Sequence, residues 1–510
     1  MQIISELQGK IPPMTELEQQ LLKRIAELEK QVTDKDSRIA YLEEQFKLAQ
    51  QKQFGKSTEG HPAQGDLFNE AEDIAELERE VEAENETVTY TRKKAKRTAL
   101  PADLPREVIV HDIENKSCDC CGGEMHKMGE DKSEKLEFIP AQIKVIEHVR
   151  PKYSCRACEQ NETQVQIKQA PMPASPIPKG IATPSLLSQI ITSKYQYALP
   201  LYRQETMFKQ HGIEISRQTM SDWIIKCASL FKPLYDKLHQ ILLEQHVIQA
   251  DETTVNVVSD DKTKSYMWLY CTGTDTPVAN NPFKNIVLYE YQPGRSGCYP
   301  ANFLLNYTGY LQVDGYQGYD QTKAKLAGCW AHARRKFDEA EKAQPKGKTG
   351  KANWALNHIQ KLYRIETRIK DKTAPEKQAI RKKESEPLLN QYKAWLEKSL
   401  LNTLPKSKLG EALNYSLNQW DKLVQYVEDG HLSIDNNRAE RAIKPFVIGR
   451  KNWLFSQTAN GANASAMLYS IVETAKANGL IPYDYISYCL TQICKPGCQI
   501  DDLLPWNIKS

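Results

Sequence analysis

Two short apolar runs that each deliver an aspartate constrain this chain more than any other feature. The runs are Ile248 to Thr253, which contains Asp251, and Leu311 to Tyr316, which contains Asp314. Each aspartate is predicted to end a strand. A third carboxylate, Glu440, lies in a predicted helix. Two acids on a sheet and one on a helix predict a pocket that binds divalent metal ions. Such ions support the cutting and joining of nucleic-acid backbones.

The roles of the three acids follow from the preferences of the metal. Mg²⁺ or Mn²⁺ takes hard oxygen ligands, and a pair of ions can share a few carboxylates with a substrate phosphate. We expect Asp251 to bridge the ions, Asp314 to complete one and Glu440 to reach the other. Each acid alone has an ordinary alternative, as a turn cap at a strand end or a surface ion pair. The neighbouring Glu252 is predicted to face the opposite side of the strand.

Length and composition indicate a multi-domain chain. At 510 residues it predicts about three or four folded units. The net charge of +3 hides basic clusters at 92–97, 334–336 and 438–451, which are either phosphate contacts or solvated surface. No apolar run reaches the roughly 20 residues of a membrane span, and no secretory signal is evident, so we expect a cytoplasmic protein without a membrane partner.

The amino-terminal third predicts a coiled coil, a linker and a zinc domain. Residues 15–50 carry a heptad pattern, interrupted by Lys35, that predicts either a dimerisation zipper or a lone amphipathic helix. Residues 51–100 are predicted to be a flexible linker. In the predicted zinc-binding domain at 101–170, an alternating segment at 135–153 predicts a β-hairpin between two C-x-x-C pairs. The four predicted ligands of a structural Zn²⁺ are Cys118, Cys121, Cys155 and Cys158, with Cys120 as an alternative to Cys121 and free or redox-active thiols as the alternative to zinc.

Residues 180–245 are predicted to be helical and resemble a helix-turn-helix. Ser216 is placed to cap the second helix, so Arg217 and Gln218 would point outward where recognition helices meet bases. Any helical hairpin with a glycine turn gives a similar pattern, so DNA reading and simple packing both remain open.

The remainder of the chain predicts an α/β core that is interrupted by helices. Strands are expected at 247–250, 266–272, 286–291, 310–313 and 325–330, with a helix at 332–342. We expect the first part of a catalytic core at 246–342, an α-helical insertion at 343–430, the second part of the core at 431–480 and a C-terminal segment at 481–510. The predicted fold class is therefore multi-domain α+β.

The surroundings of Glu440 agree with a nucleic-acid substrate. Five basic residues are predicted to contact DNA phosphates near the metals: Arg438, Arg441, Lys444, Arg450 and Lys451. Trp453 and Phe455 are either stacking platforms for bases or core aromatics. Cys329 and His332 have a spacing that can ligate metal, but the sequence offers no second pair beside them.

The chain resembles the large transposase of the insertion sequence 66 family over almost its whole length. The resemblance rests on these segments: Gln53 to Ser57, Leu100 to Arg106, Gln249 to Thr253, Val313 to Tyr316, Gly328 to Arg335, Asp435 to Pro445 and Leu503 to Asn507. It implies a bacterial DDE transposase with an RNase H-like core and the triad Asp251, Asp314 and Glu440. It also implies cleavage of element ends, joining of the 3′ ends to target DNA, a homo-oligomer, small accessory proteins from the same element, and nucleoid association when the protein is bound to DNA.

Two other functions fit the residues. A DNA-binding regulator would use the zinc domain, the helix-turn-helix and the coiled coil without catalysis, although all three acids are present. A structure-selective nuclease on the same core would hydrolyse DNA without joining strands.

Overall fold

The computed structural model describes scattered residues between 20 and 42, and then residues 143–153, 168–260, 264–278, 281–344 and 350–508. The chain divides into two compact units, one of Glu84–Pro173 and one of Met1–Ala83 with Ala174–Ser510. The predicted linker at 51–100 lies outside the described residues. So do the predicted zinc ligands Cys118, Cys121, Cys155 and Cys158.

The described part of the smaller unit is a short antiparallel ladder. Strand β1 (Lys152–Tyr153) pairs with β2 (Lys168–Gln169), and Gln169 Nε2 donates to the backbone oxygen of Arg150 at 2.9 Å. The expected hairpin at 135–153 is wrong for its described part, because residues 143–151 carry no strand. Of the described residues in this segment, only Lys152 and Tyr153 pair as a strand, and their partners in β2 lie beyond it.

A five-stranded mixed sheet forms the centre of the larger unit, with β3 in the middle of the order β5-β4-β3-β6-β7. Strands β3, β4 and β5 pair antiparallel, whereas β6 and β7 run parallel to β3. The bounds are β3 Val247–Val255, β4 Ser265–Thr272, β5 Ile286–Gln292, β6 Tyr310–Gln312 and β7 Lys325–Ala327. All five lie in or around the segments where the sequence predicts strands.

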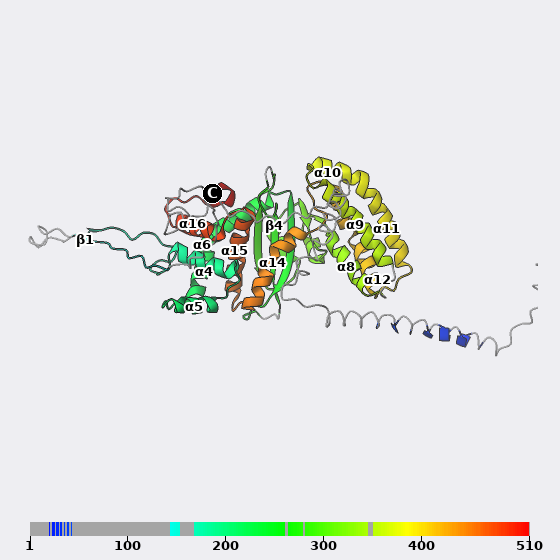
Figure 1. Cartoon of the computed structure of the whole chain (residues 1–510), viewed down its shortest axis with the longest axis horizontal. Coiled ribbons are helices and arrows are strands. Elements are labelled where there is room, and N and C mark those ends of the chain that lie inside the picture. The colour runs from blue at the N-terminus through cyan, green and yellow to red at the C-terminus, as the bar shows by residue number, and fades with distance from the viewer. Residues whose placement is uncertain are drawn as a thin grey trace, which may run out of the picture. The chain divides into compact units, whose positions relative to one another are not determined.

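Helices that precede, interrupt and follow the strands in the chain lie around the sheet (Figure 1). Their bounds are α4 Pro184–Tyr195, α5 Leu201–Gln210, α6 Arg217–Leu243, α7 Cys298–Leu304, η1 Gln317–Gln321, α14 Asn437–Trp453, α15 Ala459–Ala477, α16 Pro482–Ile493, η4 Ile500–Leu503 and η5 Pro505–Asn507. Helix α14 packs on β3 and β4, while α15 packs along β5 and against α6. One hydrophobic core includes side chains of α4, α6, the sheet and α15, so the helices of 180–245 share their core with the sheet.

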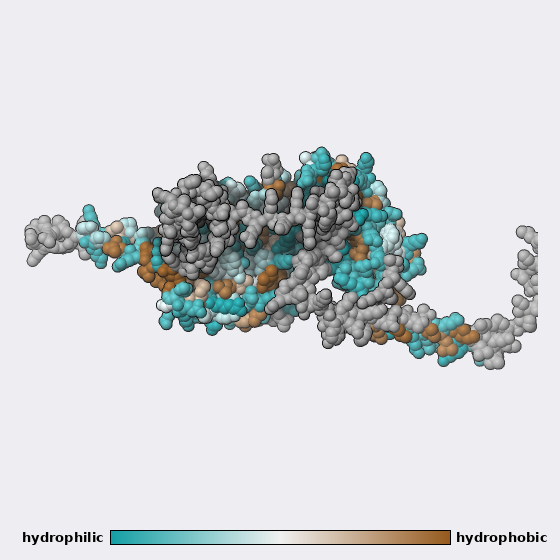
Figure 2. All heavy atoms as spheres, viewed as in Figure 1, coloured by the Kyte–Doolittle hydropathy of each residue, from teal (hydrophilic) through white to brown (hydrophobic). Residues whose placement is uncertain are grey.

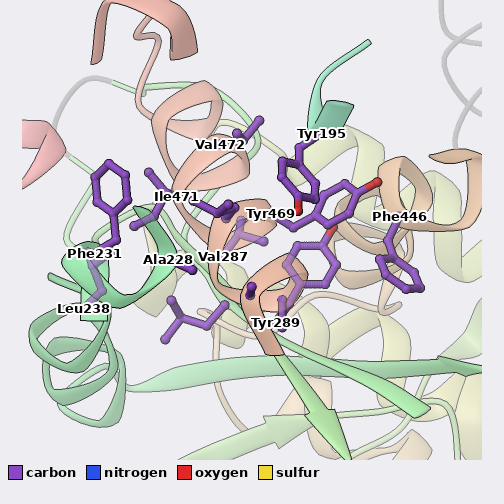
Figure 3. Close-up of a cluster of buried hydrophobic side chains, with 14 of the residues drawn as sticks. Tyr195, Ala228, Phe231, Leu238, Val287, Tyr289, Phe446, Tyr469, Ile471 and Val472 are labelled. Atoms are coloured by element: carbon purple, nitrogen blue, oxygen red, sulfur yellow. The ribbon is translucent and has the colours of Figure 1, made fainter. Parts of the chain in front are cut away.

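Aromatic side chains hold α15 against the sheet. The ring of Tyr469 lies 5.5 Å from that of Tyr289 on β5, 4.9 Å from Tyr195 on α4 and 5.3 Å from Phe446 on α14 (Figure 3). The hydroxyl of Tyr289 donates to the backbone oxygen of Ala442. Such tilted and edge-on pairs add to the free energy gained by burial, and here they fix α14 relative to β5.

Residues 350–430, within the predicted insertion, form helices with a second hydrophobic core. The segments are α9 Lys351–Ile369, α10 Ala374–Ile380, the π-helical η2 Arg381–Ser385, α11 Glu386–Leu400, α12 Lys408–Asn418, α13 Trp420–Leu423 and η3 Gln425–Val427. They pack against α8 (Trp330–Lys342), whose Trp330 and Phe337 belong to the same core. Trp330 Nε1 donates to the backbone oxygen of Leu423 at 2.9 Å, so α8 ties the insertion to the end of β7.

The described residues between 20 and 42 are helical. Apolar side chains of the heptad pattern are about half exposed on this helix, and hydrophobic and hydrophilic residues both appear on its visible face (Figure 2). In the described part of the chain, no helix has the length and hydrophobicity that a membrane span requires.

Candidate functional site

Asp251 lies in the middle of β3, not at its end as predicted. Its register partner on β4 is Leu269, and antiparallel pairing continues to Val255 opposite Ser265. Parallel pairing with β6 stops earlier, at Gln249 opposite Gln312. At Asp251, β3 is therefore still paired with β4 on one side, whereas its pairing with β6 on the other side has already ended.

Asp314 follows β6 and is held by its own turn. Its Oδ1 accepts a hydrogen bond from the backbone nitrogen of Tyr316 at 2.9 Å, and its backbone oxygen accepts one from the Tyr415 hydroxyl at 2.5 Å. Gly315 has φ of +105°, a conformation that side chains disfavour. Tyr415 lies on α12, so the insertion contacts the loop that carries this carboxylate.

Glu440 lies in the first turn of α14, whose start is fixed to β3. Asn436 Nδ2 donates to the backbone oxygen of Ala250 at 2.8 Å, and the Asn436 backbone nitrogen donates to the Cys329 sulfur at 3.1 Å. The Glu440 side chain is only 6% exposed. Neither of its carboxylate oxygens accepts a hydrogen bond from any residue that the structure describes.

The structure brings the three acids close enough for their charges to interact. Burial, and then the charge of Asp251, raise the pKa of Glu440 to about 9, with smaller contributions from Asp435 and Asp314. Burial, Glu252 and Asp314 raise the pKa of Asp251 well above its ordinary value. Buried carboxylates that repel one another favour protons or a bound cation. Oxygen ligands of this kind fit a hard divalent ion.

Helix α8 adds two basic side chains that the sequence did not assign to the site. His332 Nδ1 lies 3.4 Å from Glu440 Oε1, and Arg335 Nη2 lies 3.8 Å from Oε2. Cys329, His332 and Glu440 place one ligand atom each within 4.8 Å of one another. In the sequence, the Cys-x-x-His spacing of Cys329 and His332 was the available indication of this group. The spacing alone could not reveal the third member, Glu440, because Glu440 lies in a helix more than 100 residues later in the chain.

Glu252 takes different partners from Asp251. Arg295 Nε donates to its Oε1 at 2.8 Å, and the Tyr319 hydroxyl donates to its Oε2 at 2.6 Å. The Glu252 side chain is 1% exposed. Both carboxylate oxygens of Glu252 accept hydrogen bonds, so this side chain stabilises β3. The sequence predicts that it faces away from Asp251, because successive side chains of a strand alternate between its two faces.

The predicted DNA contacts differ in their exposure and in the partners that they bind within the chain. Arg438 and Arg441 both pair with Asp275, at 2.8 and 2.6 Å, and Arg450 donates to the Thr253 hydroxyl at 3.0 Å. Lys444 is half-buried and Lys451 is exposed. Arg217 and Gln218 are exposed at the start of α6, where Ser216 accepts from the backbone nitrogen of Thr219 as the predicted cap.

Helix α6 continues to Leu243, and its apolar face, including Trp223, is buried in the core. It is therefore much longer than a short recognition helix. Of the two aromatic candidates near α14, Trp453 packs against Phe446 at 5.5 Å, whereas Phe455 is 45% exposed.

Comparison with known proteins identifies families along most of the chain. Residues 179–464 match the family described as Transposase IS66 family, and residues 470–506 match the IS66 C-terminal element. Residues 115–159 match the zinc-finger binding domain of transposase IS66, and residues 41–109 match a region described as Transposase C of IS166 homeodomain. No solved structure matches the chain.

Relatives in Sinorhizobium fredii cover most of the chain but are themselves uncharacterized. The uncharacterized protein y4jD is 33% identical over 427 residues, which are 81% of this chain and 82% of that protein. The uncharacterized protein y4qI is 34% identical over 432 residues, which are 81% of this chain and 77% of that protein. The order of the matches also agrees with the motifs quoted from the sequence, so this chain belongs to the IS66 family of transposases.

Proposed function

We propose that this transposase cleaves the ends of its own insertion sequence and joins the 3′ ends to target DNA. Asp251, Asp314 and Glu440 would hold Mg²⁺ or Mn²⁺ at the site. When bound, such ions activate the attacking oxygen and stabilise the leaving oxygen of a phosphodiester. The order and pairing of the five strands support an RNase H-like core around these residues.

The observation that carries the proposal is the state of Glu440. Its carboxylate is buried, both oxygens accept no hydrogen bond from the described residues, and three further acids, Asp251, Asp435 and Asp314, raise its pKa. A buried carboxylate without hydrogen bonds is unfavourable by at least about 1–3 kcal/mol. A divalent cation shared with Asp251 and Asp314 would offset this penalty.

The residues of the chain would also position DNA and exclude water. Arg335 and His332, next to Glu440, are placed to orient its carboxylate. Arg217, Gln218, Arg438, Arg441, Lys444, Arg450 and Lys451 would contact DNA, and those that now pair within the chain would exchange these partners for phosphates or bases. The proposed boundaries remain those expected from the sequence, with the insertion at 343–430 between the two parts of the core.

Structural zinc fits the zinc-finger match, and Cys118, Cys121, Cys155 and Cys158 are the proposed ligands. The proposed partners are double-stranded DNA, other copies of the chain and small proteins encoded by the same element. The proposed location is the bacterial cytoplasm, at the nucleoid when DNA is bound.

The test is the substitution Asp251→Asn, assayed on DNA that carries the element ends. We expect Mg²⁺-dependent strand cleavage and joining to fall at least a hundredfold, while binding to the same DNA stays within twofold. Asp236→Asn is the matched control, because Asp236 pairs with Lys232 on the exposed face of α6. Retained joining by Asp251→Asn would remove this residue from the mechanism. Hydrolysis without joining by the wild type would favour a nuclease.

A further inference from the structure

His246, Asp429 and His431 form a cluster of side chains with metal-ligating atoms that does not include any of the three acids. His246 Nε2 lies 2.7 Å from Asp429 Oδ2, and His431 Nδ1 lies 2.9 Å from Asp429 Oδ1. The two imidazole rings are 5.3 Å apart. Each of the three residues places a ligand atom within 4.8 Å of the other two.

We propose that His246, Asp429 and His431 bind a divalent transition-metal ion of the zinc class. Two imidazole nitrogens and one carboxylate oxygen form a donor set that suits zinc. Magnesium prefers oxygen ligands, so it is not the ion that we expect at this site. The side chains of His246 and His431 are 46% and 38% exposed, so water can complete the coordination. Metal binding requires both histidines in the neutral form, with the lone pair on the nitrogen that faces Asp429.

The backbone around the three ligands is well anchored. The backbone oxygen of His246 accepts hydrogen bonds from the Tyr307 hydroxyl at 2.9 Å and the Tyr310 nitrogen at 3.0 Å. The backbone oxygen of Asp429 accepts from Arg381 Nη1 at 3.0 Å. The nearby charge of Arg381 is balanced by Glu366, at 2.6 Å. Preformed ligands of this kind reduce the ordering needed on binding.

The position of the site gives the ion a structural role. His246 immediately precedes β3, which carries Asp251, whereas His431 lies where the insertion returns towards α14 and Glu440. Between these segments, Gln312 Nε2 donates to the backbone oxygen of Ser433 at 2.7 Å. An ion at His246, Asp429 and His431 would clip the end of the insertion to the start of the central strand. The inference does not depend on the reaction proposed for the three acids.

Metal content of the full-length chain tests the site. Wild type, His246→Ala, His431→Ala and the control His211→Ala are dialysed to equilibrium against micromolar zinc and analysed for bound metal. His211 is an exposed residue at the end of α5, outside the cluster. We expect wild type and His211→Ala to bind one zinc more per chain than either cluster variant, which would keep the zinc of the zinc finger.

Thermal unfolding gives a second readout that does not depend on counting ions. Added zinc is expected to raise the unfolding midpoint of wild type and His211→Ala by several degrees more than that of His431→Ala. Equal zinc content and equal midpoint shifts in all four proteins would overturn the proposal and leave a hydrogen-bonded His-Asp-His network.

Discussion

Among single residues, Glu440 shows a conflict between burial and charge. Its pKa is raised from 4.5 to about 9 in the folded protein, first by burial and then by the charge of Asp251. The unfolded chain keeps the ordinary value. Because the folded state binds this proton more tightly, the stability from this group is full below about pH 4.5 and is lost as the pH rises towards 9.

Replacing Glu440 with glutamine should therefore stabilise the metal-free protein. In a chelating buffer at pH 8, we expect Glu440→Gln to raise the free energy of unfolding by up to about 5 kcal/mol, since pH 8 lies about 3.5 units above the ordinary pKa and each unit corresponds to about 1.4 kcal/mol. The gain should shrink towards pH 4.5. Unfolding midpoints measured across this pH range check the prediction.

The control for this substitution is Glu397→Gln, on the exposed face of α11. It should leave the midpoint unchanged at every pH. A Glu440→Gln protein whose midpoint follows the wild type between pH 4.5 and 9 would contradict the assigned protonation.

The sequence could indicate which acids matter but not their neighbours. Asp251 and Asp314 stand out because each follows an apolar run, and Glu440 because basic residues surround it. The proximity of His332 and Arg335 to Glu440 depends on how α8 and α14 meet, and no local pattern encodes that meeting. The pairing of Arg438 and Arg441 with Asp275 was unpredictable for the same reason.

At the scale of elements, α15 protects the edge of the sheet through two hydroxyls. The backbone nitrogen of Val287 on β5 donates to Thr474 Oγ1 at 3.0 Å, and the same hydroxyl donates to the Val287 oxygen at 2.9 Å. The backbone nitrogen of Tyr289 donates to Ser470 Oγ at 2.7 Å. An edge strand with unpaired backbone groups is prone to pair with other chains. The two hydroxyls of α15 bind the outer backbone groups of β5 that a sixth strand would otherwise bind.

Substituting Thr474 with valine should weaken the junction between α15 and β5. The side chain keeps its shape, but two buried backbone groups of Val287 lose their partner, which costs about 1–3 kcal/mol in the free energy of unfolding. Denaturant unfolding followed by circular dichroism measures this loss. Thr491→Val is the matched control, because Thr491 bonds only the backbone of its own exposed helix turn, and its change should stay within about 0.5 kcal/mol.

The periodicity of the chain predicts elements better than their ends. Strand β3 was expected to stop at residue 250, because residues 251–254 are polar, yet its pairing with β4 extends it to Val255. Helix α6 was expected to begin after Ser216 within a helical region that resembles a helix-turn-helix, and it runs to Leu243 even though it contains Pro233. In both cases contacts with distant segments stabilise a conformation that the local sequence does not favour.

At the scale of the whole molecule, the amino-terminal helix presents an apolar stripe. Ile25, Val32 and Ile39 occupy one heptad position and are 50%, 56% and 54% exposed, and Leu28 and Leu42 occupy the other at 45% and 50%. Five large apolar side chains in heptad spacing favour burial against an identical helix. This stripe supports the proposal that the transposase works as a homo-oligomer.

Placing charge in this stripe should separate the copies. The double substitution Leu28→Lys with Ile39→Lys puts two ammonium groups where apolar side chains would meet, and we expect sedimentation equilibrium to show the mass of a monomer where wild type shows a dimer or larger species. Glu27→Lys is the matched control, because it adds charge off the stripe and, among the described residues of this helix, removes an exposed ion pair with Arg24. If the double variant keeps the wild-type mass, another surface must hold the copies together. If the control also dissociates, net charge and not the apolar stripe is responsible.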